Sequence, residues 1–267
     1  MRRLLPLLLV AHAALAAEPM TLLIFAGGAT EADAQAALES FKKLEDQFVR
    51  AVQLPSGEPR VVASDSLPGL KPGFHVVTLG LCRDAAPALA ALKAIYPGTY
   101  TRPLTGDAGP ERCPTVQAGT VTTAHDRTVK VADAVLSAFT FVENTQDERG
   151  HEVGSATMGF ALIDKVTGRV LDVVTVEGGS TDRSGDGPAG WEYQSCTVAA
   201  TPERTGFAVV RTCTDQRTGC SLGERSIPKA WKETQRVTIV DRRLSVSPTK
   251  RSVSQRTPCV AGASEGD

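Results

Sequence analysis

The chain contains few of the residues on which catalysis and metal binding most often depend. It has 4 histidines and 3 tyrosines in 267 residues, and aromatic side chains make up 5% of the total. No C-x-x-C pair, G-x-S-x-G elbow, H-E-x-x-H helix, P-loop or dinucleotide fingerprint occurs. His75, His125 and His151 are too scattered along the chain to complete a zinc site. The sequence therefore predicts a protein that is not an enzyme. An enzymatic function would require a cleft that brings His125 or His151 against a carboxylate or a serine.

An excess of charge of one sign is also missing. Without the two arginines at positions 2 and 3, 27 basic residues stand against 30 acidic ones. A nearly neutral chain has no global field that attracts nucleic acid. After residue 17 no apolar run reaches the length of a membrane helix, so no membrane partner is expected once the leader is removed. The chain is 42% hydrophobic, enough for a core, and its length suggests two domains.

The longest apolar run lies at the N-terminus and is typical of a secretory signal peptide. Two arginines at positions 2 and 3 precede an apolar core at 4–10, and small residues follow. We assign 1–17 to the signal peptide, with cleavage near Ala17 or Glu18. An uncleaved anchor would need a longer run to cross a hydrocarbon layer of about 30 Å. We therefore expect an exported protein that is periplasmic, associated with the cell envelope, or secreted.

All six cysteines follow this leader. An even number of cysteines in an exported chain indicates disulfides. Six cysteines allow 15 sets of pairs, which the sequence alone does not resolve. We expect Cys82 to pair with Cys113 and the other four to pair among themselves, namely Cys196, Cys213, Cys220 and Cys259.

Residues 18–105 carry a strand-then-helix pattern twice. A β-favouring run at 21–25 precedes an amphipathic helix with Thr30 as its N-cap and Asp33 three residues later. The second copy begins with a strand at 74–79 and continues as a helix to Ile95. A shift of 51 residues places Asp33, Ala37, Leu38, Phe41, Lys42 and Leu44 on Asp84, Ala88, Leu89, Leu92, Lys93 and Ile95.

Two further strands are expected at 60–64 and 99–102, which gives the order βαββαβ. This order predicts an α+β, ferredoxin-like first domain. Its two helices would pack on one face of a four-stranded antiparallel sheet and leave the other face free.

The strand-to-glycine junctions 23–28 (LIFAGG) and 75–80 (HVVTLG), each followed by an Ala-rich amphipathic helix, resemble those of sporulation-related repeat (SPOR-type) domains. The resemblance covers about a third of the chain. It implies a βαββαβ module of the bacterial envelope that binds peptidoglycan glycan strands. Two features depart from the family: the link at 64–73 is unusually long, and Cys82 follows the second junction.

A glycan-binding face would need aromatic or polar side chains to contact sugar rings. Tyr100 and Arg102 lie on the same face of their strand because strand side chains alternate. We therefore name them as candidate ligand-binding residues, although a tyrosine can equally be a satisfied core residue. Phe25 and Phe74 are expected in the core.

The link at 64–73 is rich in glycine and proline. It would form either a compact loop that only connects two strands, or a shaped rim for a ligand. In the second case Asp65 and Lys71 would face the ligand.

Residues 106–118 are dense in turn formers and are expected to be a linker. The segment 119–258 predicts an all-β meander or sandwich. Hairpin turns are expected at 164–168 and 202–206, and 259–267 is expected to be a disordered tail. The expected strands are 129–131, 135–142, 156–163, 170–176, 196–200, 206–212 and 236–240.

Two polar segments of the second domain suggest ligands. Asp182, Ser184 and Asp186 have the spacing of the first ligands of a calcium loop, but Tyr193 stands where the closing acid should be. A polar, glycine-rich loop also exists without a metal. Residues 225–256 contain nine basic and two acidic residues. They would either bind an anionic envelope polymer or form a solvated surface strand.

Two functions of different classes stand open. The first is an exported, non-enzymatic binding or structural protein of the cell envelope that binds peptidoglycan glycan through its N-terminal domain. The second is a secreted protein-interaction or structural protein that does not bind glycan. Apart from the calcium hypothesis, no cofactor is expected.

Overall fold

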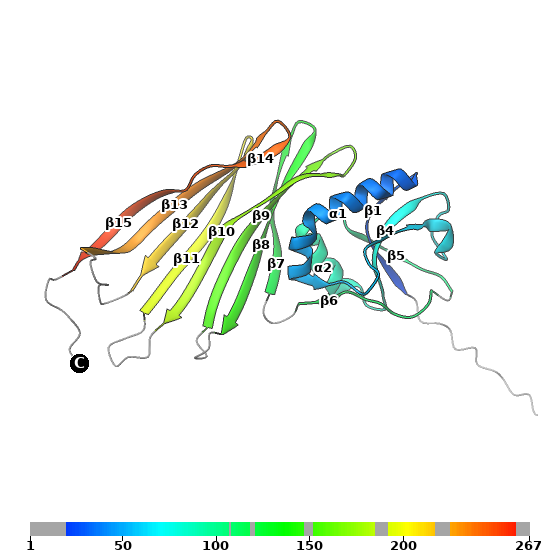
Figure 1. Ribbon diagram of the computed structural model, residues 1–267, viewed down its shortest axis with the longest axis horizontal. Coiled ribbons are helices and arrows are strands. Elements are labelled where there is room, and N and C mark those ends of the chain that lie inside the picture. Colours follow the sequence, from blue (N-terminus) through cyan, green and yellow to red (C-terminus); the bar gives the residue numbers. More distant parts are fainter. Residues whose placement is uncertain are drawn as a thin grey trace, which may run out of the picture.

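The computed structural model describes residues 20–106, 108–117, 121–146, 152–184, 192–216 and 225–259. Within these ranges the protein is mostly β-structure with two α-helices, and a large antiparallel sheet forms its longer part (Figure 1). Neither described helix is long and apolar enough to cross a membrane. The signal peptide predicted at 1–17 lies outside the described residues.

The N-terminal part alternates strands and helices close to the expected positions. Its main sheet is antiparallel with the order β3-β4-β1-β5, while β2 and β6, which were not predicted, pair with each other. The elements are β1 (Thr21–Gly28), α1 (Glu31–Ala51), β2 (Val52–Gln53), β3 (Arg60–Ala63), the short 3-10 helix η1 (Ser64–Ser66), β4 (His75–Cys82), α2 (Ala86–Ile95), β5 (Tyr100–Pro103) and β6 (Thr115–Val116).

Helix α1 begins with the predicted cap. Thr30 Oγ1 accepts a hydrogen bond from Asp33 N at 3.1 Å, and the Asp33 carboxylate accepts one from Thr30 N at 3.2 Å. The Thr30 hydroxyl also donates to this carboxylate and is the main cause that lowers the pKa of Asp33. A Cβ at Gly28 would lie 2.2 Å from Asp33 Cβ. Any larger residue at position 28 would therefore clash with the Asp33 side chain that caps the helix.

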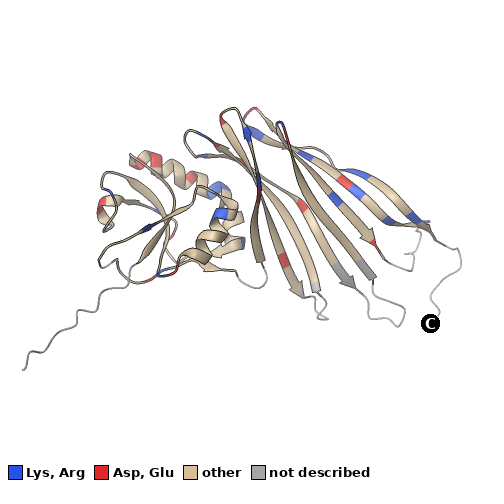
Figure 2. Ribbon diagram, turned by 180° about the vertical axis from the view of Figure 1, so that it is seen from behind, with Lys and Arg blue, Asp and Glu red and all other residues tan. Residues whose placement is uncertain are grey.

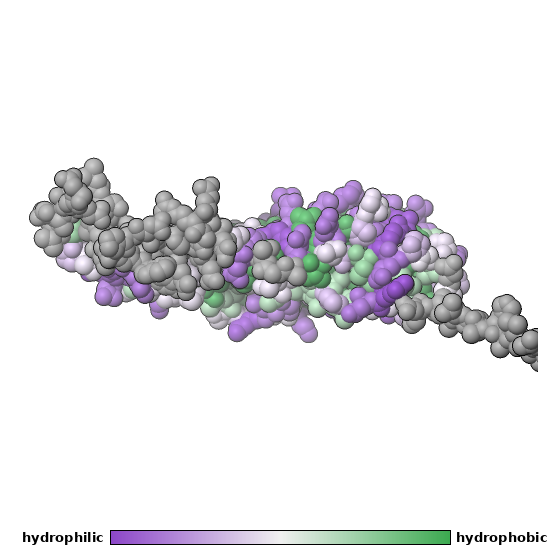
Figure 3. All heavy atoms as spheres, turned by 90° about the horizontal axis from the view of Figure 1, so that it is seen from below, coloured by the Kyte–Doolittle hydropathy of each residue, from purple (hydrophilic) through white to green (hydrophobic). Residues whose placement is uncertain are grey.

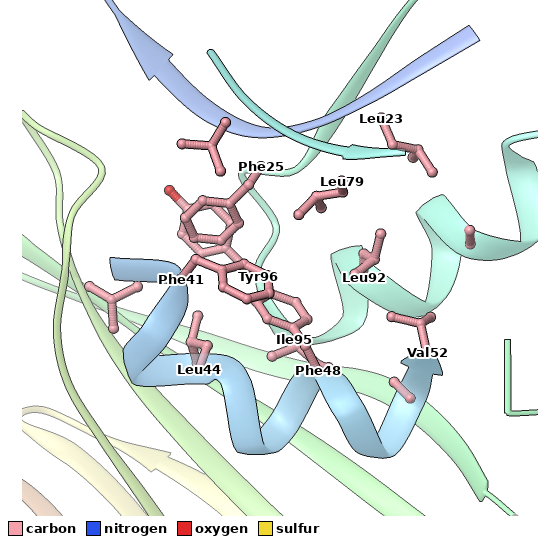
Figure 4. Close-up of a cluster of buried hydrophobic side chains, with 14 of the residues drawn as sticks. Leu23, Phe25, Phe41, Leu44, Phe48, Val52, Leu79, Leu92, Ile95 and Tyr96 are labelled. Atoms are coloured by element: carbon pink, nitrogen blue, oxygen red, sulfur yellow. The ribbon is translucent and has the colours of Figure 1, made fainter. Parts of the chain in front are cut away.

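Both helices pack on one face of the N-terminal sheet (Figure 4). Phe25 of β1 points toward the aromatic side chains of α1, and Leu23 belongs to the same buried cluster. The rings of Phe41 and Phe48 stack with centroids 4.9 Å apart, and Phe25 meets Phe41 edge-on at 5.5 Å. The expectation that Phe25 belongs to the core is confirmed.

The large sheet is an antiparallel meander. Each strand from β7 to β14 pairs with the next, and β15 pairs with the part of β13 that β14 leaves free. The hairpin turns predicted at 164–168 and 202–206 are confirmed, whereas β14 and β15 were not predicted. The strands are β7 (Val121–Val131), β8 (Ala134–Gln146), β9 (Glu152–Asp164), β10 (Val170–Ser184), β11 (Glu192–Glu203), β12 (Gly206–Asp215), β13 (Ser226–Val240), β14 (Arg243–Val246) and β15 (Lys250–Pro258).

This sheet curls so that its two halves pack against each other. β10 and β11 pair only where 180–184 meets 192–196. Beyond that point the ring of Phe160 in β9 lies 5.4 Å from the ring of Phe207 in β12, although β10 and β11 separate these strands in the sheet. Both rings belong to one buried cluster with Val237 of β13. The curled sheet therefore has an apolar core of its own.

The helices are also covered on their other side by the large sheet. Phe139 and Phe141 of β8 are fully buried and belong to the same cluster as the helix side chains. The Tyr96 hydroxyl donates a hydrogen bond to the Gly168 carbonyl at 2.7 Å, and burial raises the pKa of Tyr96 to about 12. Lys43 Nζ donates to the Val170 carbonyl at 3.0 Å. The two helices therefore form a layer between two sheets.

Two disulfides are defined. Cys82 pairs with Cys113, as predicted, and Cys196 pairs with Cys213 at directly opposite positions of β11 and β12. Cys259 is also disulfide-bonded, whereas Cys220 lies outside the described residues. These bonds indicate an oxidising compartment.

Three turns at one end of the large sheet are joined by charged side chains. Arg242 donates hydrogen bonds of 2.6 Å to both Asp133 and Asp164. Asp164 Oδ1 also accepts from the backbone N of Thr167 at 2.8 Å. That backbone bond, followed by the bond from Arg242, lowers the pKa of Asp164 to about 2. Since its folded pKa lies below the ordinary 3.8, Asp164 stabilises the fold above that pH and loses this contribution as the pH falls toward 2.

We predict that Asp164→Asn lowers the free energy of unfolding at pH 7 by about 1–2 kcal/mol, after allowance for solvent screening. The difference from the wild type should shrink between pH 4 and pH 2, a window set by the pKa of about 2. Urea unfolding followed by circular dichroism at several pH values measures this. Asp46→Asn, at an exposed helix position, is the control. A difference that stays constant with pH would contradict the assignment.

A second prediction concerns the contact between the helices and the large sheet. Phe139 pairs across the strands with Gly159, where a Cβ would lie 2.1 Å from the Phe139 ring. Phe139→Ala should lower the free energy of unfolding by roughly 3–5 kcal/mol, because a cavity remains between the layers. Val142→Ala on the same strand is the control, since Val142 is 37% exposed. Equal denaturant midpoints for the two variants would show that the contact does not stabilise the fold.

Candidate functional site

A hollow of about 320 Å³ lies on the N-terminal sheet between the loop 64–74 and strand β5. We call it the sheet hollow. The backbone of β1 at Gly27 and Gly28 forms part of its wall. The chemically distinctive side chains that line it are Lys71, Phe74, His75, Tyr100 and Arg102.

The loop 64–74 covers part of the sheet face opposite the helices. Leu67 and Leu70 of this loop pack with Leu22 and Ile24 of β1 in a separate apolar cluster. The expectation that this face is left free is therefore wrong for the part that the loop covers. The loop covers it because its leucines can be buried only against the sheet.

Hydrogen bonds fix the shape of the loop. Asp65 Oδ1 accepts one from Gly73 N at 2.7 Å, and Ser64 Oγ accepts one from Phe74 N at 3.0 Å. Thr105 N donates to the Pro68 carbonyl at 3.0 Å and ties the loop to the segment after β5. Gly73 has a φ of +84°, a conformation that favours glycine. The loop is therefore compact and held in one shape.

Tyr100 and Arg102 lie on the same face of β5, as strand alternation predicts. They pair with Ile24 and Leu22, whose side chains form the cluster on the side away from the helices. The Arg102 guanidinium carbon lies 4.8 Å from the centroid of the Tyr100 ring. Burial raises the pKa of Tyr100, while the charge of Arg102 acts in the opposite direction.

The loop supplies a second cation beside a ring. Lys71 Nζ lies 5.4 Å from the centroid of the Phe74 ring. Phe74 is 38% exposed, so the expectation that it belongs to the core is wrong: it follows the loop at the edge of the sheet rather than lying within a strand. The hollow therefore holds two pairs of a cation with an aromatic ring.

Three of the four predicted ligand-binding residues, Lys71, Tyr100 and Arg102, line the sheet hollow. Asp65 lies outside the lining, and its carboxylate holds Gly73 instead. Sequence reasoning did not name Phe74 and His75 as site residues. Both residues stand where the long link at 64–73 meets the next strand, and this position is the sequence signal that could have identified them. The His75 Nδ1 atom is buried and has no hydrogen-bond partner among the described residues.

The structure places His125 next to a serine. His125 Nδ1 lies 3.3 Å from Ser137 Oγ, but Ser137 is fully buried within the sheet. The neighbouring Asp126 carboxylate accepts a hydrogen bond from Thr140. These contacts satisfy polar groups of adjacent strands. His151 lies outside the described residues.

The structure describes only part of the candidate calcium site. The backbone of Asp182 and Ser184 belongs to β10 and pairs with β11. Their side chains, and Asp186 altogether, lie outside the described residues. In the part of the chain that the structure describes, no group of histidine, cysteine or acidic side chains could hold a metal.

The basic residues of 225–256 lie on β13 to β15 and in their turns (Figure 2). Arg242 pairs with two aspartates, Arg236 lies 3.4 Å from Glu203, and Arg251 lies 3.9 Å from Glu233. Three of the nine basic residues in this segment therefore have a carboxylate partner. Seen from below, hydrophilic side chains line both flanks of the molecule, with hydrophobic ones near its middle (Figure 3).

Comparison with known protein families, with curated proteins and with solved structures gave no match.

Proposed function

We propose that this chain is an exported, non-enzymatic binding protein of the cell envelope whose N-terminal part binds glycan through the sheet hollow. The disulfides support the export, since they form in an oxidising compartment. We further propose that the N-terminal part is a ferredoxin-like, SPOR-type module. The sheet order β3-β4-β1-β5, with both helices on one face, supports this assignment.

The observation that carries the proposal is the clustering of Tyr100, Phe74, Lys71 and Arg102 around one hollow. Aromatic faces pack against the apolar faces of sugar rings, and cationic side chains donate hydrogen bonds to ring substituents. These side chains are positioned by a strand and by a loop that is fixed by internal hydrogen bonds. A hollow that is already formed loses little conformational entropy when it binds a ligand.

The test uses the full chain without its leader, because the N-terminal helices share their core with the large sheet. Retention on purified cell-wall sacculi and calorimetric titration with chitotetraose are measured. We predict that Tyr100→Ala weakens binding about 5- to 30-fold, whereas Tyr100→Phe, which keeps the ring, stays within about threefold of the wild type. Val49→Ala, exposed on α1, is the control. If the wild type is retained no better than an unrelated secreted protein, the proposal fails.

A second candidate function, the binding of an extended peptide, rests on a trough of about 810 Å³ in the large sheet. It is lined by 122–127 of β7, by 197–200 of β11 and by Val142, Ala156 and Met158. Within the described residues β7 pairs only with β8, and β11 pairs with β10 only as far as Cys196. Both strands therefore leave main-chain donors and acceptors beside the trough, and an inserted strand would satisfy them.

For this candidate we predict that an acetylated peptide alternating valine and threonine binds the full chain, and that Ala156→Phe weakens binding at least fivefold by filling the trough. Val166→Phe, in an exposed turn, should leave binding unchanged. Fluorescence anisotropy of the labelled peptide measures this. Equal affinities of the two variants would exclude the trough as the binding site.

A further inference from the structure

The charged side chains that line the sheet hollow are all cationic. Lys71 and Arg102 line it, and no aspartate or glutamate does so. The carboxylates of Asp33 and Asp65 are held by other groups: Asp33 accepts hydrogen bonds from Thr30, and Asp65 accepts one from Gly73. The side chains that line the hollow therefore carry two positive charges and no carboxylate, although the chain as a whole is nearly neutral.

Neither cation has a carboxylate partner among the residues that the structure covers. Arg102 donates one side-chain hydrogen bond, to the Thr101 carbonyl at 3.1 Å, and otherwise lies over the Tyr100 ring. Lys71 lies over the Phe74 ring. Several arginines elsewhere have carboxylate partners: Arg50 with Glu143, Arg211 with Glu177 and Glu233, and Arg242 with two aspartates. A cation–π contact satisfies a guanidinium or an ammonium less fully than an anion does, so both groups keep donors for a ligand.

We infer that the sheet hollow is specific for an anionic saccharide, in which a carboxylate or phosphate on the sugar lies between Lys71 and Arg102 while the ring packs on Tyr100 or Phe74. This inference rests on the proposed glycan binding and names its ligand class. The rings set which sugar face is accepted, and the cations distinguish charged from neutral saccharides. A carboxylate and a phosphate present the same acceptor chemistry, and the test separates them.

Four probes test the inference on the full chain without its leader. The neutral probe is chitotetraose, and the carboxylate probe is a hyaluronan tetrasaccharide, which alternates the same N-acetylated sugar with glucuronic acid. N-acetylglucosamine and its 6-phosphate form the phosphate pair. We predict that the hyaluronan fragment binds roughly tenfold more tightly than chitotetraose in 50 mM salt, and that this advantage shrinks as salt is raised. A larger gain for the phosphate pair would assign the site to phosphate.

Variants of the two cations connect this preference to the hollow. Lys71→Gln combined with Arg102→Gln should remove the tenfold preference, so that the hyaluronan fragment binds this variant no more tightly than chitotetraose does. Lys93→Gln, an equal charge change at an exposed position of α2, should keep the preference.

If chitotetraose binds but neither anionic probe binds more tightly than its neutral partner, the inference is wrong while the glycan-binding function survives. If no saccharide binds, both are wrong. Thermal unfolding of each variant, expected within a few degrees of the wild type, shows that lost binding is not lost folding.

Discussion

The burial of two helices between two sheets is the constraint on which the structure depends. Phe25 of the small sheet, Phe41 and Phe48 of α1, and Phe139 of the large sheet belong to one cluster, and each is fully buried. An aromatic side chain in such a layer removes 150–250 Å² of surface from water. Each of the two sheets thus supplies one wall of the same core. Removing either wall would expose a helix face that carries large apolar side chains.

This layer also decides where a ligand can bind. With the helices on one side of the small sheet, polar groups that contact solvent must come from the other side, where strand alternation directs Tyr100 and Arg102. The loop 64–74 then encloses part of that face. It can do so because Leu67 and Leu70 bury themselves against the sheet, which leaves Lys71 exposed above it. The helix layer and the proposed binding surface therefore lie on opposite faces of a single sheet.

Local signals account for the parts of the fold that the sequence predicts. The Thr30 cap, the two-residue alternation of β5 and the turns at 164–168 and 202–206 depend on contacts between near neighbours in the chain. The strand ends were harder to place, because β9, β10 and β13 continue into polar residues where the apolar pattern stops. β15 is mostly exposed and carries no apolar alternation, so only its pairing with β13 defines it.

Contacts distant in sequence explain the remaining differences. The run 135–142 is apolar at nearly every position, which indicates a strand buried on both faces, yet nothing local says that α1 and α2 cover one of them. For the hollow, alternation predicts that Tyr100 and Arg102 share a face. The approach of Lys71 and Phe74 instead depends on two loop glycines with φ near +85° and on the hydrogen bonds that close the loop.

The difference between what neighbouring residues show and what distant contacts decide applies to charge as well. Counted along the sequence, 225–256 is the most basic segment considered, and the hollow contributes only Lys71 and Arg102. In space three of those nine basic residues, Arg236, Arg242 and Arg251, have carboxylate partners, whereas neither cation of the hollow has one among the described residues. An anion gains little from a guanidinium that is already paired, since it must first displace the internal carboxylate. The two cations over aromatic rings have no such competitor among the described residues, and this supports the hollow as the proposed anion site.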